Sequence, residues 1–255
     1  MIAYVLLPIP GTSGFDYRVP PGMEVKPGDW VEVPFRKRML LGIVQELRAE
    51  PEYPGQLQEV RRVLGEALRP EFLPLLSRLS QEACVALGMT VAHVVPKPVG
   101  KRALPPRLPF TYREPEKKVE LSDEQEGAVA VIAEGIGQGR QFLLFSPPAA
   151  GKTEVYLACA RLAKEAGRAS LLLEPEISLL PQLWARAKRA LGEAPTVYHG
   201  ELSASARWQV WQDALRGRIS AAVGTRSAIF LPFPNLGLIV LDEEGEPAYK
   251  EEMAP

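Results

Sequence analysis

Short apolar runs and turn residues alternate along the first 65 residues. Segments such as AYVLLPIP, FDYRV and WVEVPF are rich in Val, Leu and aromatic side chains, and Pro-Gly pairs stand between them. This spacing is typical of short strands joined by tight turns, so it predicts a small antiparallel β domain or barrel. Residues 71–88 then place apolar side chains three and four positions apart, which predicts an amphipathic helix packed on that domain.

The segment between Pro96 and Pro115 has a different character. It holds six prolines with interspersed Lys and Arg and few regularly spaced apolar residues. Such a composition favours an extended, semi-rigid connection. We therefore expect an N-terminal domain over residues 1–95, a proline-rich linker over 96–118 and a second domain over 119–255.

The second domain opens at a well-specified helix start. Ser122 can cap this helix, and Gln125, three residues later, can reach back to complete a capping box. Short apolar runs, among them FLLF, ASLLLEP and LGLIVLDEE, then alternate with helical segments that end at glycine. This alternation predicts a parallel sheet covered by helices. The expected fold class is α/β, with a small barrel-like β domain followed by a lobe that holds a parallel sheet.

The charge balance restricts how the chain could bind nucleic acid. It carries 30 Lys and Arg against 31 Asp and Glu, so its net charge is close to zero. Binding to DNA would therefore depend on local basic clusters. The candidates are Arg36, Lys37 and Arg38 and the basic stretch 97–107.

Cysteine usage and hydropathy indicate a compartment. Cys84 and Cys159 lie far apart without a CxxC spacing, so neither a zinc site nor a disulfide framework is predicted in this chain. No run approaches the roughly twenty apolar residues that span a bilayer, and the N-terminus lacks the pattern of a signal peptide. We expect a soluble protein of the reducing cytoplasm, without a membrane partner.

Residues 146–153 read SPPAAGKT and lie between the run FLLF and a helical segment. This is the context of a phosphate-binding loop, in which backbone N–H groups and a helix N-terminus face the phosphates. On that template Lys152 reaches the outer phosphates and Thr153 ligates magnesium. Pro147 and Pro148 have no N–H group to donate. The remaining donors are Ala149, Ala150, Gly151, Lys152 and Thr153.

An acidic group follows the run LGLIVL about ninety residues after Lys152. A P-loop fold needs a carboxylate at the end of a neighbouring strand, so Asp242 is expected to hold Mg²⁺ together with Thr153. Glu243 is the candidate base for water. The candidate catalytic residues are Lys152, Asp242 and Glu243. A chance GKT and a solvated acidic strand end are the alternatives, and the pairing of the two motifs favours a site for ATP and Mg²⁺.

Longer stretches of both halves resemble one protein family. GKTEVYLA, LLLEPEISLLPQ, VYHGELSASAR and VGTRSAIFLPFPNLGLIVLDEEGEPAYK are similar to the first RecA-like helicase lobe of the PriA family, within superfamily 2. LLPIP with FDYRVPPG, KPGDWVEVPFRKR and GIV resembles the N-terminal domain with which that family binds DNA 3′ ends. The resemblance covers nearly the whole chain and is weakest between residues 48 and 120.

The resemblance implies a DNA-end pocket in the first domain. Phe15, Asp16 and Tyr17 fall on the family's pocket for the 3′ end of a nascent leading strand. A carboxylate there can accept a hydrogen bond from a free 3′-hydroxyl, while aromatic faces stack on the terminal base. An ordinary strand at FDY is the structural alternative.

Further roles are implied for the second domain. Gln125 would help to recognise adenine, and Thr225, Arg226 and Ser227 fall on the motif that lines the DNA track. Arginine and hydroxyl side chains suit contacts with phosphate. An ordinary turn after a strand is the alternative for GTRS.

Several departures from the family pattern bear on mechanism. The family's acidic motif is DEEH, and Gly245 here removes the side chain expected to couple ATP hydrolysis to DNA movement. The P-loop has Ser146 and Ala149 where the family has glycine, and two prolines stiffen it. The linker has no room for the family's winged-helix domain. A second RecA-like lobe and a zinc domain also lie outside these residues, so we expect the chain, as a fragment or a truncated form, not to unwind DNA.

Two functions follow from the resemblance and a third from the P-loop alone. The favoured one is a replication-restart primosomal protein that binds stalled or abandoned forks and DNA 3′ ends and helps to reload the replicative helicase, with ATP binding but impaired helicase activity. The alternative is an active ATP-dependent 3′-to-5′ DNA helicase in the full-length form, so whether ATP is hydrolysed stays open. A P-loop kinase or nucleotide switch would be indifferent to DNA. The implied partners are forked and single-stranded DNA, single-strand-binding protein and other primosome proteins.

Overall fold

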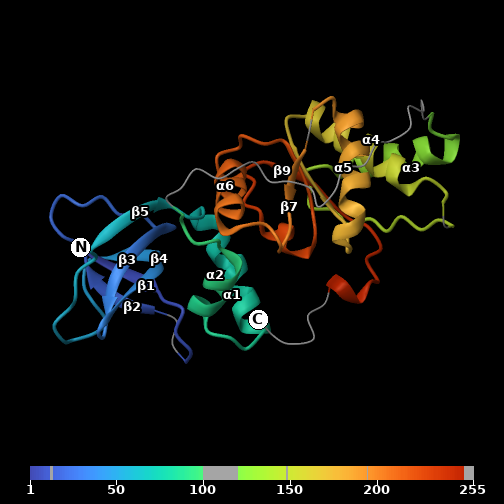
Figure 1. Ribbon diagram of the computed structural model, residues 1–255. Coiled ribbons are helices and arrows are strands. Elements are labelled where there is room, and N and C mark those ends of the chain that lie inside the picture. Colours follow the sequence, from blue (N-terminus) through green and yellow to red (C-terminus); the bar gives the residue numbers. More distant parts are fainter. Residues whose placement is uncertain (12–13, 100–119, 148, 194, 250–255) are drawn as a thin grey trace. The chain divides into compact units, whose positions relative to one another are not determined.

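The computed structural model describes residues 1–11, 14–99, 120–147, 149–193 and 195–249. These residues divide into two compact units, residues 1–99 and residues 120–249, each with a sheet and a core of its own (Figure 1). Most of the predicted linker lies outside the described residues. So do residues 250–255, at the end of the predicted second domain.

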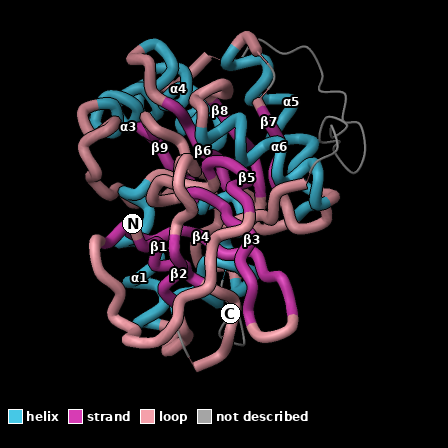
Figure 2. Tube along the Cα trace, turned by 90° about the vertical axis from the view of Figure 1, so that its left-hand side faces the viewer, coloured by secondary structure: helices cyan, strands magenta, loops and turns pink. Residues whose placement is uncertain are grey.

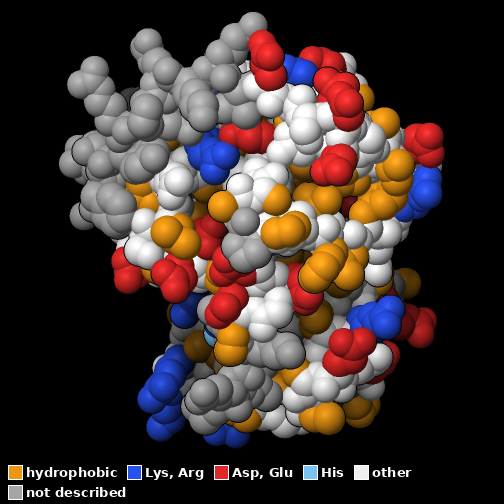
Figure 3. Space-filling model, turned by 90° about the vertical axis from the view of Figure 1, so that its right-hand side faces the viewer, with side chains coloured by type: hydrophobic (Ala, Val, Ile, Leu, Met, Phe, Trp, Pro, Cys, Tyr) orange, Lys and Arg blue, Asp and Glu red, His pale blue; other side chains and the backbone are white. Residues whose placement is uncertain are grey.

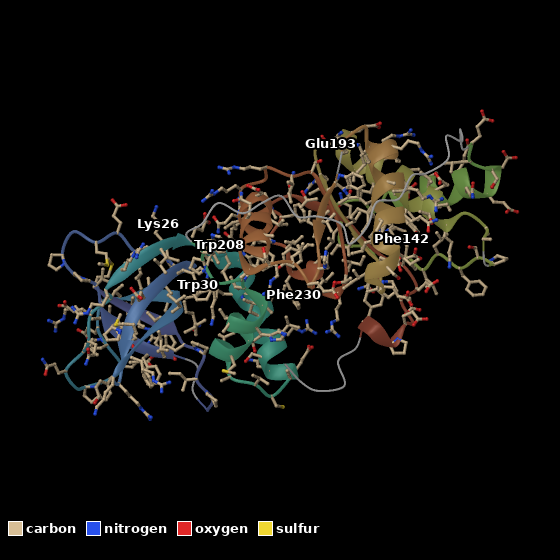
Figure 4. The ribbon with its side chains drawn as sticks, viewed as in Figure 1. Lys26, Trp30, Phe142, Glu193, Trp208 and Phe230 are labelled. Carbon is tan, nitrogen blue, oxygen red and sulfur yellow. The ribbon has the colours of Figure 1, made fainter. Side chains whose placement is uncertain are left out.

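The first unit is built on a five-stranded antiparallel sheet. Its order is β2-β1-β4-β3-β5, and every neighbouring pair is antiparallel. The side chains that alternate toward the inner face are mainly valines, and they form one buried cluster with Tyr17. Trp30, labelled in Figure 4, is also buried. The strands are β1 (Ile2–Leu6), β2 (Gly14–Arg18), β3 (Asp29–Phe35), β4 (Arg38–Arg48) and β5 (Arg62–Glu66).

The two edges of this sheet meet. The N–H of Arg18, at the end of β2, donates to the carbonyl oxygen of Gln58 (2.8 Å), and the N–H of Val60 donates to the carbonyl oxygen of Arg18 (3.0 Å). Residues 58–60 lead into β5, which is the opposite edge of the sheet. These bonds close the sheet into a barrel and satisfy backbone groups that an open edge would leave unpaired. The predicted barrel-like β domain is confirmed.

Two helices follow the sheet where the sequence predicts one. A 3₁₀ turn (Pro70–Phe72) leads into α1 (Leu73–Glu82), and α2 (Leu87–Val94) comes after a break. The prediction of a single helix over 71–88 is wrong, because Cys84 adopts a left-handed backbone conformation (φ 53°) that ends α1. The apolar spacing continues across this break, so it gave no indication of it. Helix α2, which begins where the predicted helix was expected to end, packs against β1 and β4, and α1 packs against α2.

The second unit holds a four-stranded parallel sheet in the order β7-β8-β6-β9. Helices pack against it, with α4 beside β6 and β9, α5 beside β8 and α6 beside β7. Figure 2 shows these strands in magenta between helices in cyan. The predicted parallel sheet covered by helices is thus confirmed. The elements are α3 (Asp123–Ala133), α4 (Lys152–Glu165), β6 (Ala169–Leu173), α5 (Leu180–Leu191), β7 (Thr196–Tyr198), α6 (Ala204–Leu215), β8 (Ala221–Gly224) and β9 (Leu236–Leu241), with 3₁₀ turns at Ile177–Leu179, Arg226–Phe230 and Pro247–Tyr249.

The run FLLF at 142–145 was expected to be the strand before the P-loop, and this expectation is wrong. Residues 141–147 form no strand, and Leu143 and Phe145 are 78% and 92% exposed. An apolar run indicates a buried strand only if a neighbouring strand offers hydrogen-bond partners. Here the run and β9 both line a cleft of about 1000 Å³. Phe142 is labelled in Figure 4, and hydrophobic side chains lie beside acidic ones on the face of the molecule in Figure 3.

Candidate nucleotide site and DNA-end site

The loop before α4 has the geometry of an anion-binding turn. Ala149 (φ 61°) and Gly151 (φ 78°) are left-handed, and α4 begins directly after them at Lys152. No side chain caps this helix. The N–H group of Glu154 donates to the carbonyl oxygen of Gly151 (2.9 Å), so the N–H groups of Lys152 and Thr153 are the first-turn donors left for a ligand. A phosphate group at that point would also meet the positive end of the helix dipole. The residues present therefore fit the phosphates of a nucleotide.

Gln125 links α3 to this loop. Its Oε1 accepts a hydrogen bond from the N–H of Ser122 (2.9 Å), and the N–H of Gln125 donates to Ser122 Oγ, which completes the predicted capping box. Its Nε2 donates to the carbonyl oxygen of Ala150 (2.9 Å). Both ends of the amide therefore bond the protein itself, and Gln125 fixes the position of the loop. Adenine recognition by Gln125 remains a prediction.

Ala149→Gly is expected to stabilise the second unit. A left-handed alanine carries strain of about 1–2 kcal/mol, which glycine removes. Glycine also makes the unfolded chain more flexible, which offsets part of this gain, so the net stabilisation is about 0.5–1 kcal/mol. We expect the midpoint of thermal unfolding to rise by a few degrees. Gly151→Ala is the matched control, because its Cβ would lie 2.6 Å from Gln125 Nε2, and it should lower the midpoint. A fall in the midpoint for Ala149→Gly would contradict the assigned backbone conformation.

The carboxyl end of β9 brings Asp242 to the first turn of α4. The Tyr156 hydroxyl donates a short hydrogen bond to Asp242 Oδ2 and lies 3.1 Å from Thr153 Oγ1. The N–H of Asp242 donates to the carbonyl oxygen of Leu173 (3.0 Å), which fixes the strand end. The sequence predicts that Thr153 and Asp242 act together. The structure links them through the hydroxyl of Tyr156, a residue that the sequence did not single out. In the sequence, the one indication of this role is that Tyr156 lies one helical turn after Thr153, so the two side chains share a face of the helix.

Acidic groups crowd this end of the sheet. Burial, and then the charge of Asp242, raises the pKa of Glu174 to about 7. Ionisation of Glu174 therefore costs folding free energy, and its contribution to stability falls as the pH rises from 4.5 to about 7. Burial, and then the hydrogen bond to Asp242, also raises the pKa of Tyr156, so its hydroxyl stays protonated and donates the hydrogen bond to Asp242. A divalent cation would offset the negative charge here.

The acidic residues after Asp242 are exposed. Glu243 is left-handed (φ 50°), and its N–H donates to Asp242 Oδ1 (3.1 Å). Within the described residues, no three His, Cys, Asp or Glu side chains are arranged to hold a metal ion. Magnesium nevertheless fits Thr153 and Asp242, because it often takes one or two protein ligands and completes its shell with phosphates and water.

The motif expected to line a DNA track follows β8. Thr225 donates its N–H to the carbonyl oxygen of Tyr198 (3.2 Å), and Arg226 begins a 3₁₀ turn. Ser227 Oγ is buried without a hydrogen bond to any described residue. Since β8 and β9 are parallel to β6, Thr225 and Asp242 follow strand ends at the same edge of the sheet. Ligands of open parallel sheets generally bind at this edge.

In the first unit, Phe15 and Asp16 lie on opposite faces of β2. The ring of Phe15 packs against Phe35 of β3 at 5.0 Å. The Asp16 side chain is 3% exposed, and its Oδ2 accepts hydrogen bonds from the N–H groups of Glu52 (2.7 Å) and Tyr53 (3.2 Å). Sequence reasoning missed Phe35, Glu52 and Tyr53, because they lie far from Phe15 and Asp16 in the chain and only the fold brings them together.

Tyr17 occupies the core of the barrel. It is buried, and its hydroxyl donates to the carbonyl oxygen of Pro34 (3.0 Å). Burial raises the pKa of Tyr17 to about 12. In this conformation its ring face is not open to a DNA base, so the expected stacking role does not fit Tyr17. The residue supports the strand that carries Phe15 and Asp16.

The predicted basic cluster forms the tip of the β3–β4 hairpin. Arg36, Lys37 and Arg38 are all exposed, and Arg36 has φ 54°. The Arg36 guanidinium lies 5.5 Å from the centre of the Phe35 ring. The cluster therefore lies next to Phe35, which contacts Phe15. Most of the other basic stretch, 97–107, lies outside the described residues.

Comparison with known families gives two matches. Residues 4–96 match the model of a 3′DNA-binding domain (3′BD), named for PriA, and residues 122–251 match the model of DEAD/DEAH box helicases. None of the described helices is both long and apolar enough to cross a membrane.

Curated relatives cover both matches. The replication restart protein PriA of Rickettsia conorii is 31% identical over 261 residues, which take in 98% of this chain and 38% of the relative. The Chlamydia trachomatis protein of the same name is 35% identical over 216 residues (83% of this chain, 28% of the relative). That of Bacillus subtilis is 40% identical over 154 residues (56% of this chain, 19% of the relative). The chain thus spans less than two fifths of the length of these relatives.

Proposed function

Because this chain belongs to the PriA family of replication restart proteins, we propose that it binds stalled or abandoned replication forks through the 3′ end of the nascent leading strand. It would thereby help to reload the replicative helicase. Partners suggested by the family are forked and single-stranded DNA, single-strand-binding protein and other primosome proteins. The cytoplasm is the proposed compartment, because the replicating chromosome lies there.

The observation that carries this proposal is the environment of Asp16. Its Oδ2 is held by two backbone N–H groups, whereas its Oδ1 is buried and accepts no hydrogen bond from a described residue. A buried carboxylate oxygen without a donor is costly, and a hydroxyl group supplies the missing donor. The exposed cations at the hairpin tip, Arg36, Lys37 and Arg38, would contact the DNA backbone.

We further propose that the second unit binds ATP with Mg²⁺. Lys152 and the N–H groups of residues 149–153 would hold the phosphates, and Thr153 and Asp242 would hold the metal ion. The bound ion would neutralise charge on the phosphates. Tyr156 orients Asp242, Gln125 fixes the loop, and Glu243 is the proposed base for water.

Efficient helicase activity is not part of this proposal. The alanine at 149 is strained, and Gly245 has no side chain with which to couple the site to DNA. An active ATP-dependent 3′-to-5′ helicase in the full-length protein is the second candidate, supported by the contact of Thr153 and Asp242 with one tyrosine. DNA-stimulated hydrolysis of ATP by the full-length protein would favour this second candidate.

Asp16→Ala tests end binding. We expect the wild-type chain to bind a model fork with a 3′-hydroxyl leading-strand end about tenfold more tightly than one with a 3′-phosphate, because a phosphate is repelled by the carboxylate. Asp16→Ala should remove most of this preference. Fluorescence anisotropy at fixed salt measures both affinities, and equal affinity of the wild-type chain for the two forks would refute end recognition.

A further inference from the structure

Arg48 reaches the DNA-end site from a neighbouring part of the barrel. Tyr4 of β1 is paired with Asp16 of β2 on one side and with Glu46 of β4 on the other, so these three residues cross the same face of the sheet. Arg48, two residues after Glu46, lies over the Tyr4 ring at 4.4 Å and bonds Glu46 through its guanidinium group. Its Nη1 lies 3.6 Å from Asp16 Oδ1.

These two atoms are complementary and incompletely bonded. Asp16 Oδ1 and Arg48 Nη1 are both buried, and neither makes a hydrogen bond to the part of the chain that is described. Their separation of 3.6 Å is too long for a good hydrogen bond between them. Asp16 Oδ1 is an acceptor without a donor, and Arg48 Nη1 is a donor whose nearest acceptor, 2.9 Å away, is the exposed carboxylate of Glu52. A hydroxyl group is both donor and acceptor, so one hydroxyl oxygen could satisfy the two atoms together.

We propose that Arg48 and Asp16 form a two-point site for the terminal 3′-hydroxyl of DNA, in which the hydroxyl donates to Asp16 Oδ1 and accepts from Arg48 Nη1. This inference rests on the proposed end-binding function and adds a specificity residue to it. Contacts on both sides of the hydroxyl fix its orientation, which a carboxylate alone does not. An end that lacks the hydroxyl leaves Asp16 Oδ1 without a donor and offers Arg48 Nη1 no acceptor, and this penalty is the source of discrimination.

In the absence of DNA, the side chain of Glu52 pairs with Arg48. Its Oε1 lies 2.9 Å from Arg48 Nη1 in an ion pair, and its side chain is 75% exposed. Because the Glu52 carboxylate is largely exposed, it can return to water when an incoming hydroxyl takes its place beside Arg48, so the displacement costs little. The backbone N–H of Glu52 keeps its bond to Asp16 Oδ2, so the turn stays in place. Glu52 also repels the terminal phosphates of DNA.

The test compares two forks that differ by one oxygen atom. One leading strand ends in a 3′-hydroxyl and the other in a 2′,3′-dideoxynucleotide, and anisotropy measures the ratio of their affinities. We expect a ratio of about ten for the wild-type chain, because both hydrogen bonds involve charged groups. Arg48→Leu should lower this ratio to about two, and Arg48→Lys, which keeps the charge but not the planar fork, should at least halve it. Glu52→Gln should tighten binding of the hydroxyl end several-fold.

Arg36→Leu is the matched control. It removes an exposed arginine from the same unit, so it should weaken both forks alike and leave the ratio unchanged. If Asp16→Asn abolishes the ratio while Arg48→Leu and Arg48→Lys keep it, end binding stands and the role of Arg48 is disproved. If the wild-type ratio is one, end binding itself fails. Thermal unfolding shows whether Arg48→Leu is folded. If it is not, the affinity ratio of Arg48→Lys decides whether Arg48 contributes to end recognition.

Discussion

Lys152→Ala is expected to weaken binding of ATP in the presence of Mg²⁺ by about 50- to 100-fold. A lysine that reaches the outer phosphates makes charge-assisted contacts with them, and losing these costs about 2–3 kcal/mol. Helix α4 should stay intact, because Lys152 lies in its first turn and alanine is a good helix former. Titration of a fluorescent ATP analogue, with and without Mg²⁺, measures the loss.

Arg161→Ala is the control for this prediction. Arg161 lies on the same helix, is exposed and pairs only with the exposed Glu165 among the ion pairs of the described residues. It should leave the affinity for ATP unchanged. If both variants bind ATP as the wild-type chain does, the nucleotide site is misplaced. Fork binding should be unaffected by either substitution, which separates the ATP site from end recognition.

Gly28→Ala is expected to destabilise the first unit by about 3 kcal/mol or more, through left-handed strain and forced overpacking. Gly28 has φ 91°, and a Cβ there would lie 2.1 Å from the carbonyl oxygen of Leu68. The backbone of Gly28 also bonds Val44, Ala67 and Leu68, so it cannot move without breaking these bonds. Hydrogen exchange of the β3 and β4 amides, read by mass spectrometry, should accelerate by two orders of magnitude or more.

Gly22→Ala isolates the steric part of that effect. Gly22 has a similar backbone conformation (φ 80°), but no atom lies within 4 Å of the place of its Cβ. This substitution should therefore cost only the backbone strain, about 1–2 kcal/mol. Equal losses for the two variants would show that the close approach of Gly28 to Leu68 does not limit stability.

The sequence predicted the parts of the fold that depend on local pattern. The alternation of apolar runs and Pro-Gly turns predicted the β domain, and Ser122 with Gln125 predicted the start of α3, because capping acts within four residues. The break at Cys84 was missed, since a left-handed residue leaves the apolar spacing unchanged. The strand expected at FLLF was wrong, because strand formation depends on a partner elsewhere in the chain.

The candidate sites divide in the same way. The P-loop could be found because its residues are consecutive, and Asp242 because it follows an apolar strand. Tyr156 was missed, since the sequence does not show which side chain lies between Thr153 and Asp242. Arg48 and Glu52 were missed for a related reason. Only the pairing of β1 with β2 and with β4 brings Arg48 to Asp16, and the Glu52 backbone reaches Asp16 from the turn that follows β4.

The closed barrel also has a kinetic consequence. The bonds between Arg18 and residues 58–60 join positions about forty residues apart, so a long segment must be ordered before they form. Contacts of this kind slow folding, whereas the short α1 and α2 helices depend on local contacts. Closure should therefore be among the last events as the first unit folds. Until it occurs, the edge of β2 that carries Asp16 is open to pairing with other chains.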